Sequence, residues 1–495
     1  MLKTDFIDEV NVELEFGGGN RHIDIRFGIL NYGTLDKDER PNARKINIAI
    51  VGLPEPCEKF LGWLATCNSG IAAKETSKTN LFPRFPGFGA NSPFNAEWIC
   101  DNRSIRNLSI VQIAQLQTLN TPGEITREAV KLYTSEFDYL ANETRPDMIF
   151  CIVPELLGEH LDRAAGMTKP VSRYLEDDEI INCYRHDFHH CLKSEAMSYR
   201  IPIQLVLPST FDMGIRGKST KKKHRSKKPR QLQDTATRAW NLFTAMYYKA
   251  GCVPWRLARR SNDYATCYIG VSFYRSLDEK TVMTSIAQIF NERGEGVVVR
   301  GGQARLSKKD RTPHLNDTDS ASIVIQALQR YRDEHKTMPA RVVLHKSSYF
   351  TPEEQNGFRA GLNQERISMI DMLSIRKSSI RLFRTGTYPI LRGTHMQLDS
   401  NRHLLYTRGS VPFFETYPGL YVPHALEIQF DSIEQSREEL CREILALTKM
   451  NWNNTQFDMR DPITLRAARG VGDIMKYIPI NAPESRIAAR YSFYM

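Results

Sequence analysis

The stretch CYIGVSFYRS, Cys267 to Ser276, decides the fold class of the second half of the chain. Its first half is almost continuously apolar, which is typical of a strand buried on both faces of a sheet. Ser272 stands toward the far end of this strand, where an active-site group would be expected. A serine hydroxyl is neutral, so it neither anchors a metal ion firmly nor acts as a base. The stretch therefore predicts a buried strand whose catalytic group is missing.

The sequence around this stretch continues as a second α/β segment. Further strand candidates are Gly296–Gly301, Ala340–Lys346, Ser379–Pro389, His403–Gly409 and His424–Phe430. Helical periodicity follows around Ile433–Met450 and Thr464–Tyr477. The carboxylate-rich run NDTDS, Asn316–Ser320, is interpreted as a helix N-terminus capped by an Asp or a Ser, because it lacks the glycine and the glutamate of a calcium loop.

The first half of the chain also predicts an α/β fold. Three short β-branched runs end at glycine or proline: Lys45–Gly52, Asp147–Pro154 and Ile201–Pro208. They suit strands buried in a parallel sheet. Helical patterns such as Thr126–Asn142 lie between them, so crossover helices are expected.

Length and charge limit the class of protein. A chain of 495 residues is too long for one core, and two or three domains are expected. The formal net charge is +10, and the sequence pI is about 9.0. This balance favours polyanionic partners, although a basic enzyme without such a partner would also fit.

Cysteine usage and the first residues favour a soluble protein of a reducing cytoplasm. The nine cysteines form no C-x-x-C pair, which argues against a disulfide framework and against a zinc ribbon. The first residues bring acidic side chains and no apolar segment, and no apolar run is long enough to span a bilayer. No membrane association is expected.

One segment is strongly basic. Residues 216–230, RGKSTKKKHRSKKPR, hold nine Lys or Arg and cannot pack against a core. Two interpretations stay open, a solvated surface loop and an arm that contacts phosphates. The candidate backbone contacts are Lys218, Lys221, Lys222, Lys223, Arg225, Lys227 and Lys228.

Five side chains could converge on an anion. His189 and Lys193 are four residues apart in a helical pattern, so they share one face. Gln204 is an amide inside an apolar strand, and Asn241 and Lys249 lie within roughly 80° of each other on the next helix. Cations and amide or imidazole donors are what a terminal phosphate requires. Taken singly, each of these residues would also be ordinary on a helix or a surface.

Common catalytic motifs are absent. The glycine-rich segments Phe16–Asn20 and Arg293–Gln303 lack the spacing of a phosphate-binding loop and are interpreted as turns. The sequence contains no H-E-x-x-H, no G-x-S-x-G and no paired Cys and His ligand spacing. Hydrolase and zinc-enzyme interpretations therefore have little support.

The order of these elements resembles the Argonaute family, specifically its short prokaryotic branch of MID and PIWI domains. The matching segments are HHCLKSEAMSYRIPIQLVLP, NLFTAMYYKAGCVPW, CYIGVSFYRS, PARVVLHKSSYFTPEE and LTKMNWNN followed by DPITLRAARGVGDIM. The resemblance implies two domains. Residues 1–260 would hold an N-terminal segment and a Rossmann-like MID domain, and residues 261–495 an RNase H-like PIWI domain.

The resemblance also implies a pocket for the 5′-phosphate of a guide strand. His189 matches the first pocket residue of the family, which is often Tyr, and Lys193 matches the Lys one turn later. Gln204, Asn241 and Lys249 match the family's Gln, Asn and Lys. A divalent cation, Mg²⁺, would join the phosphate, and its protein ligand would be the carboxylate of Met495.

Active PIWI domains hold two metal ions with acidic residues, and this sequence has none at the matching positions. Ser272 matches the first acid, Ser347 or Ser348 the second, and Ala468 or Arg469 the last. The resemblance and the side-chain chemistry therefore predict a protein that binds nucleic acid and is not itself an enzyme.

The expected function is recognition of complementary single-stranded DNA with a guide, most simply a guide RNA. The resemblance implies a heterodimeric partner that carries an APAZ domain with a sirtuin-like, TIR or nuclease effector and acts in defence. Two alternatives stay open. One is an active RNase H-type nuclease that uses Glu295, Asp317 or Asp399, and the other is an α/β enzyme acting on small molecules.

Overall fold

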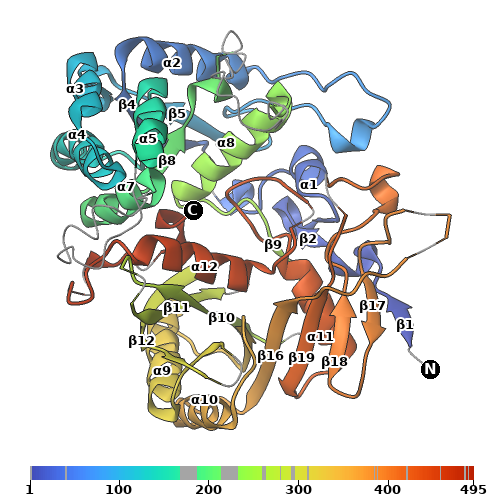
Figure 1. The fold of residues 1–495 in the computed structure, drawn as a ribbon. Helices are drawn as coiled ribbons and strands as arrows, with labels where there is room; N and C mark the ends of the chain where they lie inside the picture. Colours follow the sequence, from blue (N-terminus) through green and yellow to red (C-terminus); the bar gives the residue numbers. More distant parts are fainter. Residues whose placement is uncertain are drawn as a thin grey trace. The chain divides into compact units, whose positions relative to one another are not determined.

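The chain divides into two units, which are described separately (Figure 1). The middle unit is Glu39–Cys252, and the composite unit is Met1–Asp38 together with Val253–Met495. The computed structural model describes residues 3–495 except 40–41, 168–186, 213–231, 259–263, 279, 291–295, 309–310, 384, 387, 420–421, 458, 484–485 and 489. Among the described residues, no helix is both long and apolar enough to cross a membrane.

The N-terminal segment belongs with the C-terminal part of the chain, which differs from the expected division into residues 1–260 and 261–495. β1 (Thr4–Phe6) pairs with β17 (Thr394–Gln397) at the edge of the large sheet. The backbone N–H of Val253 donates to the Asp36 carboxylate at 3.0 Å, directly after the middle unit ends. These contacts are long-range in sequence, so no local pattern could have predicted them.

The middle unit contains a parallel sheet in the order β5-β4-β7-β8. Its strands are β4 (Arg44–Gly52), β5 (Ala96–Ile99), β7 (Met148–Ile152) and β8 (Ile203–Val206), and β6 (Ile105–Asn107) also pairs with β4. Each of the three runs predicted in this half forms a strand. β7 is buried at every position, as its continuous apolar pattern requires.

Among the described residues of this unit, the helices that connect and cover the strands are α2 (Pro54–Asn68), α3 (Ile110–Gln115), α4 (Pro122–Glu143), α5 (Glu155–Met167), α7 (Phe188–Ala196) and α8 (Thr235–Lys249). One core contains apolar side chains of α4 and α7 packed with β4 and β7. Elsewhere in the unit, Trp240 and Phe243 of α8 pack with Phe85, and the Trp240 indole donates to the Arg84 carbonyl at 3.0 Å. This packing fixes α7 and α8, the helices that carry the candidate anion site.

The composite unit is built on one large sheet in the order β1-β17-β18-β19-β16-β15-β10-β11-β12. Its strands include β10 (Thr266–Arg275), β11 (Val282–Phe290), β12 (Gly296–Gln303), β15 (Arg341–Lys346), β16 (Met369–Lys377), β18 (Arg402–Leu405) and β19 (Leu426–Ser432). β15 runs parallel to both β10 and β16. On either side of these three strands the pairing is antiparallel, with β11 beside β10 and β19 beside β16. This is the arrangement expected of an RNase H-like domain.

Helices cover both faces of this sheet (Figure 1). Side chains of α9 (Asp317–His335) and α10 (Pro352–Gln364) form the core on one face with Val271 of β10. α12 (Ile463–Met475) packs on the other face, so close that a Cβ at Gly270 would lie 2.3 Å from the Thr464 carbonyl oxygen. α11 (Arg437–Leu447) packs against the N-terminal segment.

Small elements complete the composite unit. A three-stranded sheet joins β2 (Leu14–Glu15), β3 (Arg21–His22) and β9 (Arg256–Leu257), and α1 (Ile25–Tyr32) follows β3 in the chain. A hairpin of β13 (Arg305–Leu306) and β14 (Pro313–His314) precedes α9.

Three local predictions in this unit are wrong. The glycine-rich segment Arg293–Gln303 is not a turn, because its residues Gly296–Gln303 form strand β12. The described residues of the run 379–389 form a loop that leaves Phe383 83% exposed, whereas the strand is β16 just before it. β16 was not predicted, because its buried polar residues Asp371 and Ser374 interrupt the apolar pattern. The N-cap of α9 is Asn316, which accepts from the Asp319 backbone, and not an Asp or a Ser.

Candidate nucleic-acid interface

Two buried lysines form the centre of the candidate anion site in the middle unit. Lys193 lies in α7 and Lys249 is the last residue of α8, and both are almost fully buried. The Lys249 ammonium donates to the Ile203 carbonyl at 3.0 Å and to the Gln204 side-chain oxygen at 2.6 Å. The structure therefore brings three of the predicted residues to one place, beside β8.

Like charges meet in this place. Burial lowers the pKa of Lys193 to about 7, although Asp187 and the Cys151 thiol oppose the shift. Burial also holds the pKa of Lys249 well below its ordinary value, and the Lys193 charge lowers it further. Two cations held close together in a buried site cost free energy, and a bound anion would offset that cost. The arrangement can therefore hold a phosphate.

His189 is in the same environment but acts as a neutral group. Burial lowers its pKa to about 2, with further contributions from Lys193, His190 and Lys249. Its ring lies 5.1 Å from that of His190, centre to centre. A neutral imidazole can donate one hydrogen bond or stack on a flat group, but it adds no positive charge to the site.

The remaining predicted residues are Asn241, Met495 and those of the basic segment. Asn241 lies about 12 Å before Lys249 along the axis of α8, and its amide donates to Gln233 at 3.1 Å. Met495 is in the composite unit, and its part in the site stays a prediction. The basic residues Lys218, Lys221, Lys222, Lys223, Arg225, Lys227 and Lys228 lie outside the described residues.

Two neighbours of the lysines, Cys151 and Asp187, were not predicted from the sequence. Cys151 lies on β7, close enough for both lysines to oppose the rise in the pKa of its thiol that burial causes. Asp187 caps α7, with its carboxylate accepting from the His190 backbone at 3.1 Å. An Asp at the start of a predicted helix is a signal for a cap, and it was available in the sequence.

In the composite unit, the first two positions matched to catalytic acids come together. Ser272 is buried near the end of β10. The Ser347 backbone donates to the Val271 carbonyl at 3.2 Å, which places the end of β15 beside Ser272. The hydroxyl of Ser348 instead donates to Pro313 in the β13–β14 hairpin at 3.3 Å. Ser347 is therefore the better match to the second acid.

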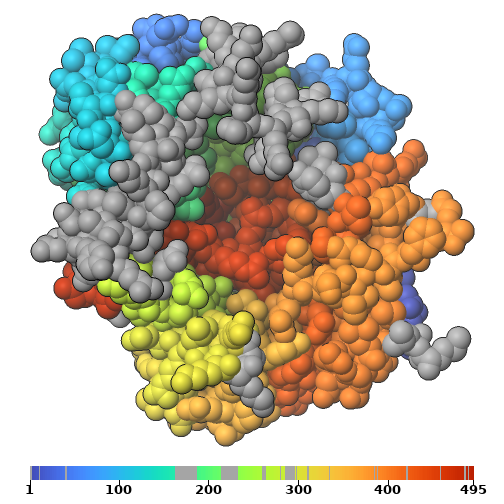
Figure 2. Space-filling model, viewed as in Figure 1, coloured from blue at the N-terminus to red at the C-terminus, as the bar shows by residue number. Residues whose placement is uncertain are grey.

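The third position lies on α12, which crosses the same strands. Thr464 bonds to His345 of β15 at 2.9 Å, and Ala468, one turn later, is fully buried. Arg469 points elsewhere and forms an ion pair with Asp461. The matched positions thus carry two hydroxyls and a methyl group, none of which supplies negative charge for a metal ion. Figure 2 shows red C-terminal residues at the surface, between the yellow and the orange parts of this unit.

Of the three acids considered for an alternative active site, Asp317 and Asp399 are described, and both lie apart from Ser272. Glu295 is outside the described residues. The backbone of Asp317 packs against Gly357 at the contact of α9 with α10, on the face of the sheet away from α12. Asp399, in the turn between β17 and β18, binds Arg402 at 2.7 Å. β18 is four strands from β10, which corresponds to roughly 19 Å.

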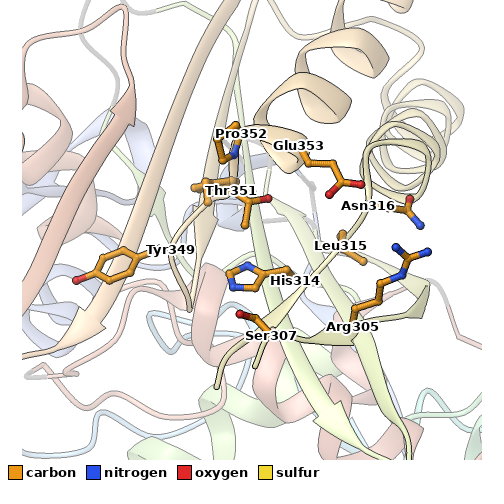
Figure 3. Close-up of a pocket in the computed structure, with 10 residues that line it drawn as sticks. Arg305, Ser307, His314, Leu315, Asn316, Tyr349, Thr351, Pro352 and Glu353 are labelled. Atoms are coloured by element: carbon orange, nitrogen blue, oxygen red, sulfur yellow. The ribbon is translucent and has the colours of Figure 1, made fainter. Parts of the chain in front are cut away.

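A pocket of about 450 Å³ lies on the α9–α10 side of the composite unit (Figure 3). Arg305, Asn316 and Glu353 gather at one end of it, and Tyr349 lies at the other. Beneath its lining residue His314, the buried Lys346 ammonium bonds to the Glu354 carboxylate at 2.8 Å. Because this cation is balanced by a carboxylate of its own unit, the floor of the pocket is less suited to an anion than the Lys193 and Lys249 site.

Comparison with solved structures shows the Argonaute fold. Clostridium butyricum Argonaute bound to a guide DNA and a 19-mer target DNA has a TM-score of 0.61 at 13% identity, over 97% of this chain and 54% of that chain. Aa-Ago with externally bound siRNA gives 0.56 at 15% identity, over 96% and 53%. A. aeolicus Argonaute gives 0.54 at 14% identity, over 95% and 53%.

The chain thus spans about half the length of the solved structures it matches. No family model and no curated protein matches the sequence. The predicted fold class is confirmed as a mixed α/β architecture with parallel sheets, of the MID–PIWI kind found in Argonaute proteins.

Proposed function

We propose that this chain is a short Argonaute that binds a 5′-phosphorylated guide, taken here to be RNA, and uses it to recognise complementary single-stranded DNA. The observation that carries the proposal is the buried pair Lys193 and Lys249 beside Gln204. A guide phosphate would be held by these cations, while base pairing would read the sequence. The net charge of +10 suits backbone contacts whose strength falls with salt.

In this proposal a divalent cation, Mg²⁺, binds together with the guide phosphate. The carboxylate of Met495 would be its protein ligand, and an oxygen donor of this kind suits a hard cation. The cation would offset phosphate charge that the lysines leave uncompensated. The neutral His189 and the amide of Gln204 would orient the phosphate, and Asn241 would contribute on guide binding.

We further propose that the chain does not cleave its target. Ser272, Ser347 and Ala468 would leave the positions of two metal ions without carboxylate ligands. Cleavage chemistry needs all of these anchors together, so Ser272→Asp should remain inactive with Mg²⁺ or Mn²⁺. Clear cleavage by the unmodified chain would instead support the alternative of a nuclease with other acids.

The output of a binding protein without catalysis would come from a partner chain. The proposed partner carries an APAZ domain joined to a sirtuin-like, TIR or nuclease effector, and target binding would activate it in the cytoplasm in defence against phage or plasmids. Guide–target pairing can activate such a partner only if the guide–target duplex binds the active arrangement of the complex more tightly than the inactive arrangement.

The decisive experiment compares guides with a 5′-phosphate and a 5′-hydroxyl. Lys193→Met and Lys249→Met together keep the apolar stems and remove both charges. The affinity for the phosphorylated guide should fall at least about a hundredfold, because buried charge contacts are lost. The preference for the phosphorylated guide over the hydroxyl guide should disappear with it.

The matched control is Lys131→Met, which removes an exposed lysine of α4 that pairs with Glu128. This variant should bind both guides like the unmodified chain. If the double variant keeps the full preference for the phosphate, the pocket is elsewhere. If the purified chain carries no short nucleic acid and binds none, an enzyme acting on small molecules becomes the better account.

A further inference from the structure

Asp187, His189 and His190 bring three metal-ligating side chains together at the start of α7. One ligand atom of each lies within 4.8 Å of the corresponding atoms of the other two. In the part of the chain that the structure describes, no other group of three or more His, Cys, Asp or Glu side chains meets this criterion. All three residues belong to the middle unit, so the group is complete without any contribution from the composite unit.

The local structure explains why these side chains converge. Asp187 is the N-cap of α7, and its Oδ1 accepts the His190 backbone N–H at 3.1 Å. The same cap brings the His190 Nδ1 to 3.6 Å from Oδ1. A carboxylate has two oxygens, so one can keep the cap while the other binds a metal ion. The His189 ring lies beside that of His190 at an angle of 57°.

We propose that Asp187, His189 and His190 form a binding site for a divalent transition-metal ion such as Zn²⁺. Bonds of about 2.0–2.2 Å to nitrogen and oxygen in a tetrahedral site separate the ligand atoms by about 3.4 Å. Small side-chain rotations from the observed spacing reach that distance. Two imidazoles favour Zn²⁺, Co²⁺ or Ni²⁺ over Mg²⁺, which prefers oxygen ligands. The site therefore differs in residues and in metal from the Mg²⁺ proposed beside Met495.

Three protein ligands leave a fourth coordination position open, and the surrounding charges select what fills it. Lys193 follows His189 by one turn, and the N-terminal end of α7 also carries partial positive charge. These charges weaken binding of a cation alone and favour an anion at the open position. Metal and phosphate should therefore strengthen each other's binding. This coupling rests on the proposed guide-phosphate site, whereas the metal site does not.

The test titrates metal-free, guide-free protein with ZnCl₂ by calorimetry and with CoCl₂ by visible absorption. One ion should bind per chain, and millimolar Mg²⁺ should not displace it. His190→Ala and Asp187→Asn should each weaken binding at least about tenfold, and Asn can still cap the helix. His424→Ala, which removes a histidine of the composite unit, should leave the affinity unchanged. A melting temperature close to that of the unmodified chain would show that each variant is folded.

The site is ruled out if fewer than about one in ten chains bind zinc, or if His190→Ala and His424→Ala have equal effects. A second titration in millimolar inorganic phosphate tests the coupling. Phosphate should raise the zinc affinity of the unmodified chain but not of Lys249→Met. A zinc affinity that phosphate does not change would support the metal site and contradict the coupling. Loss of guide binding in Lys249→Met with zinc binding intact would separate the two proposals.

Discussion

Two pairs of buried lysines, one pair in each unit, meet opposite kinds of neighbour. In the composite unit Lys346 binds Glu354 at 2.8 Å and Lys449 binds Glu9 at 2.6 Å. The ion pair of Lys346 with Glu354 joins β15 to α10, and the ion pair of Lys449 with Glu9 joins the C-terminal part of the chain to its N-terminal segment. In the middle unit the charge of Lys193 instead lowers the pKa of Lys249, which donates to neutral oxygens of β8.

The difference separates charges that hold the fold together from charges that a ligand would use. A buried ion pair is costly to break because the remaining partner stays buried and charged. Two neighbouring buried cations raise the free energy of the fold, and such perturbed groups are concentrated at functional sites. By this criterion Lys346 and Lys449 are structural, whereas Lys193 and Lys249 are the residues of the anion site that we propose.

The largest expected effect is on the structural side of this comparison. Glu9 binds both Arg392 and Lys449, so Glu9→Gln leaves two buried cations without their carboxylate. The free energy of unfolding should fall by about 3–5 kcal/mol in urea titrations. The exposed Glu128→Gln is the control and should change stability little.

The same urea titrations can contradict the distinction between structural lysines and lysines of the proposed site. Lys193→Met should leave stability unchanged or raise it, because it removes a charge that burial disfavours. If Lys193→Met destabilises the chain as much as Glu9→Gln does, the lysines of the middle unit are also structural and the proposed site loses its main support.

The next effect concerns pH. The pKa of Lys193 is about 7 in the free protein, so this lysine loses its charge as the pH rises above 7. A bound phosphate needs the charged form, and the affinity for a 5′-phosphorylated guide should fall by up to about tenfold per pH unit from pH 7.5 to 9. The affinity for a 5′-hydroxyl guide should stay nearly constant, and an equal decline for both guides would contradict this origin.

The stability of the guide-free protein should change with pH in the opposite direction to its affinity for the guide. The unfolded chain keeps this lysine charged up to its ordinary pKa, so the unfolded state binds more protons between pH 7 and 10. The free energy of unfolding of the guide-free protein should therefore rise over this range. Lys193→Met should flatten the rise, as measured by urea titrations at several pH values.

The smallest effect is expected outside both clusters, at the basic segment. Deleting residues 218–228 should weaken guide or target binding a few-fold at low salt and reduce its salt dependence, because phosphate contacts release counterions. Binding measured at two salt concentrations checks this. An unchanged slope would show that the segment is a solvated loop.

The sequence predicted the elements better than their long-range pairing. β7 and β10 were evident because their apolar runs are continuous, whereas β16 was missed because Asp371 is buried on it. That Asp binds Arg341 at 2.7 Å and accepts from the Glu434 backbone, contacts that no pattern in nearby sequence signals. The pairing of the N-terminal segment with the C-terminal part of the chain could not be predicted either, because it too depends on contacts that are distant in sequence.

The candidate site was predicted in part. The helical spacing led to Lys193, and the amide among apolar residues led to Gln204, and their role in binding an anion stays a prediction. Residues eight apart on α8 share a face but lie about 12 Å apart along the axis, so the part of Asn241 in the site stays a prediction. Burial and mutual repulsion of the lysines depend on how α7, α8 and β8 pack, so they required the structure.

The most direct test of the account loads the chain with a 5′-phosphorylated guide and adds labelled single-stranded DNA in Mg²⁺ or Mn²⁺. We expect complementary DNA to be retained with the guide–protein complex and to stay at full length, while scrambled DNA is released. Cleavage of the complementary strand, or retention that does not depend on complementarity, would contradict the proposal that this fold binds a guided target without cutting it.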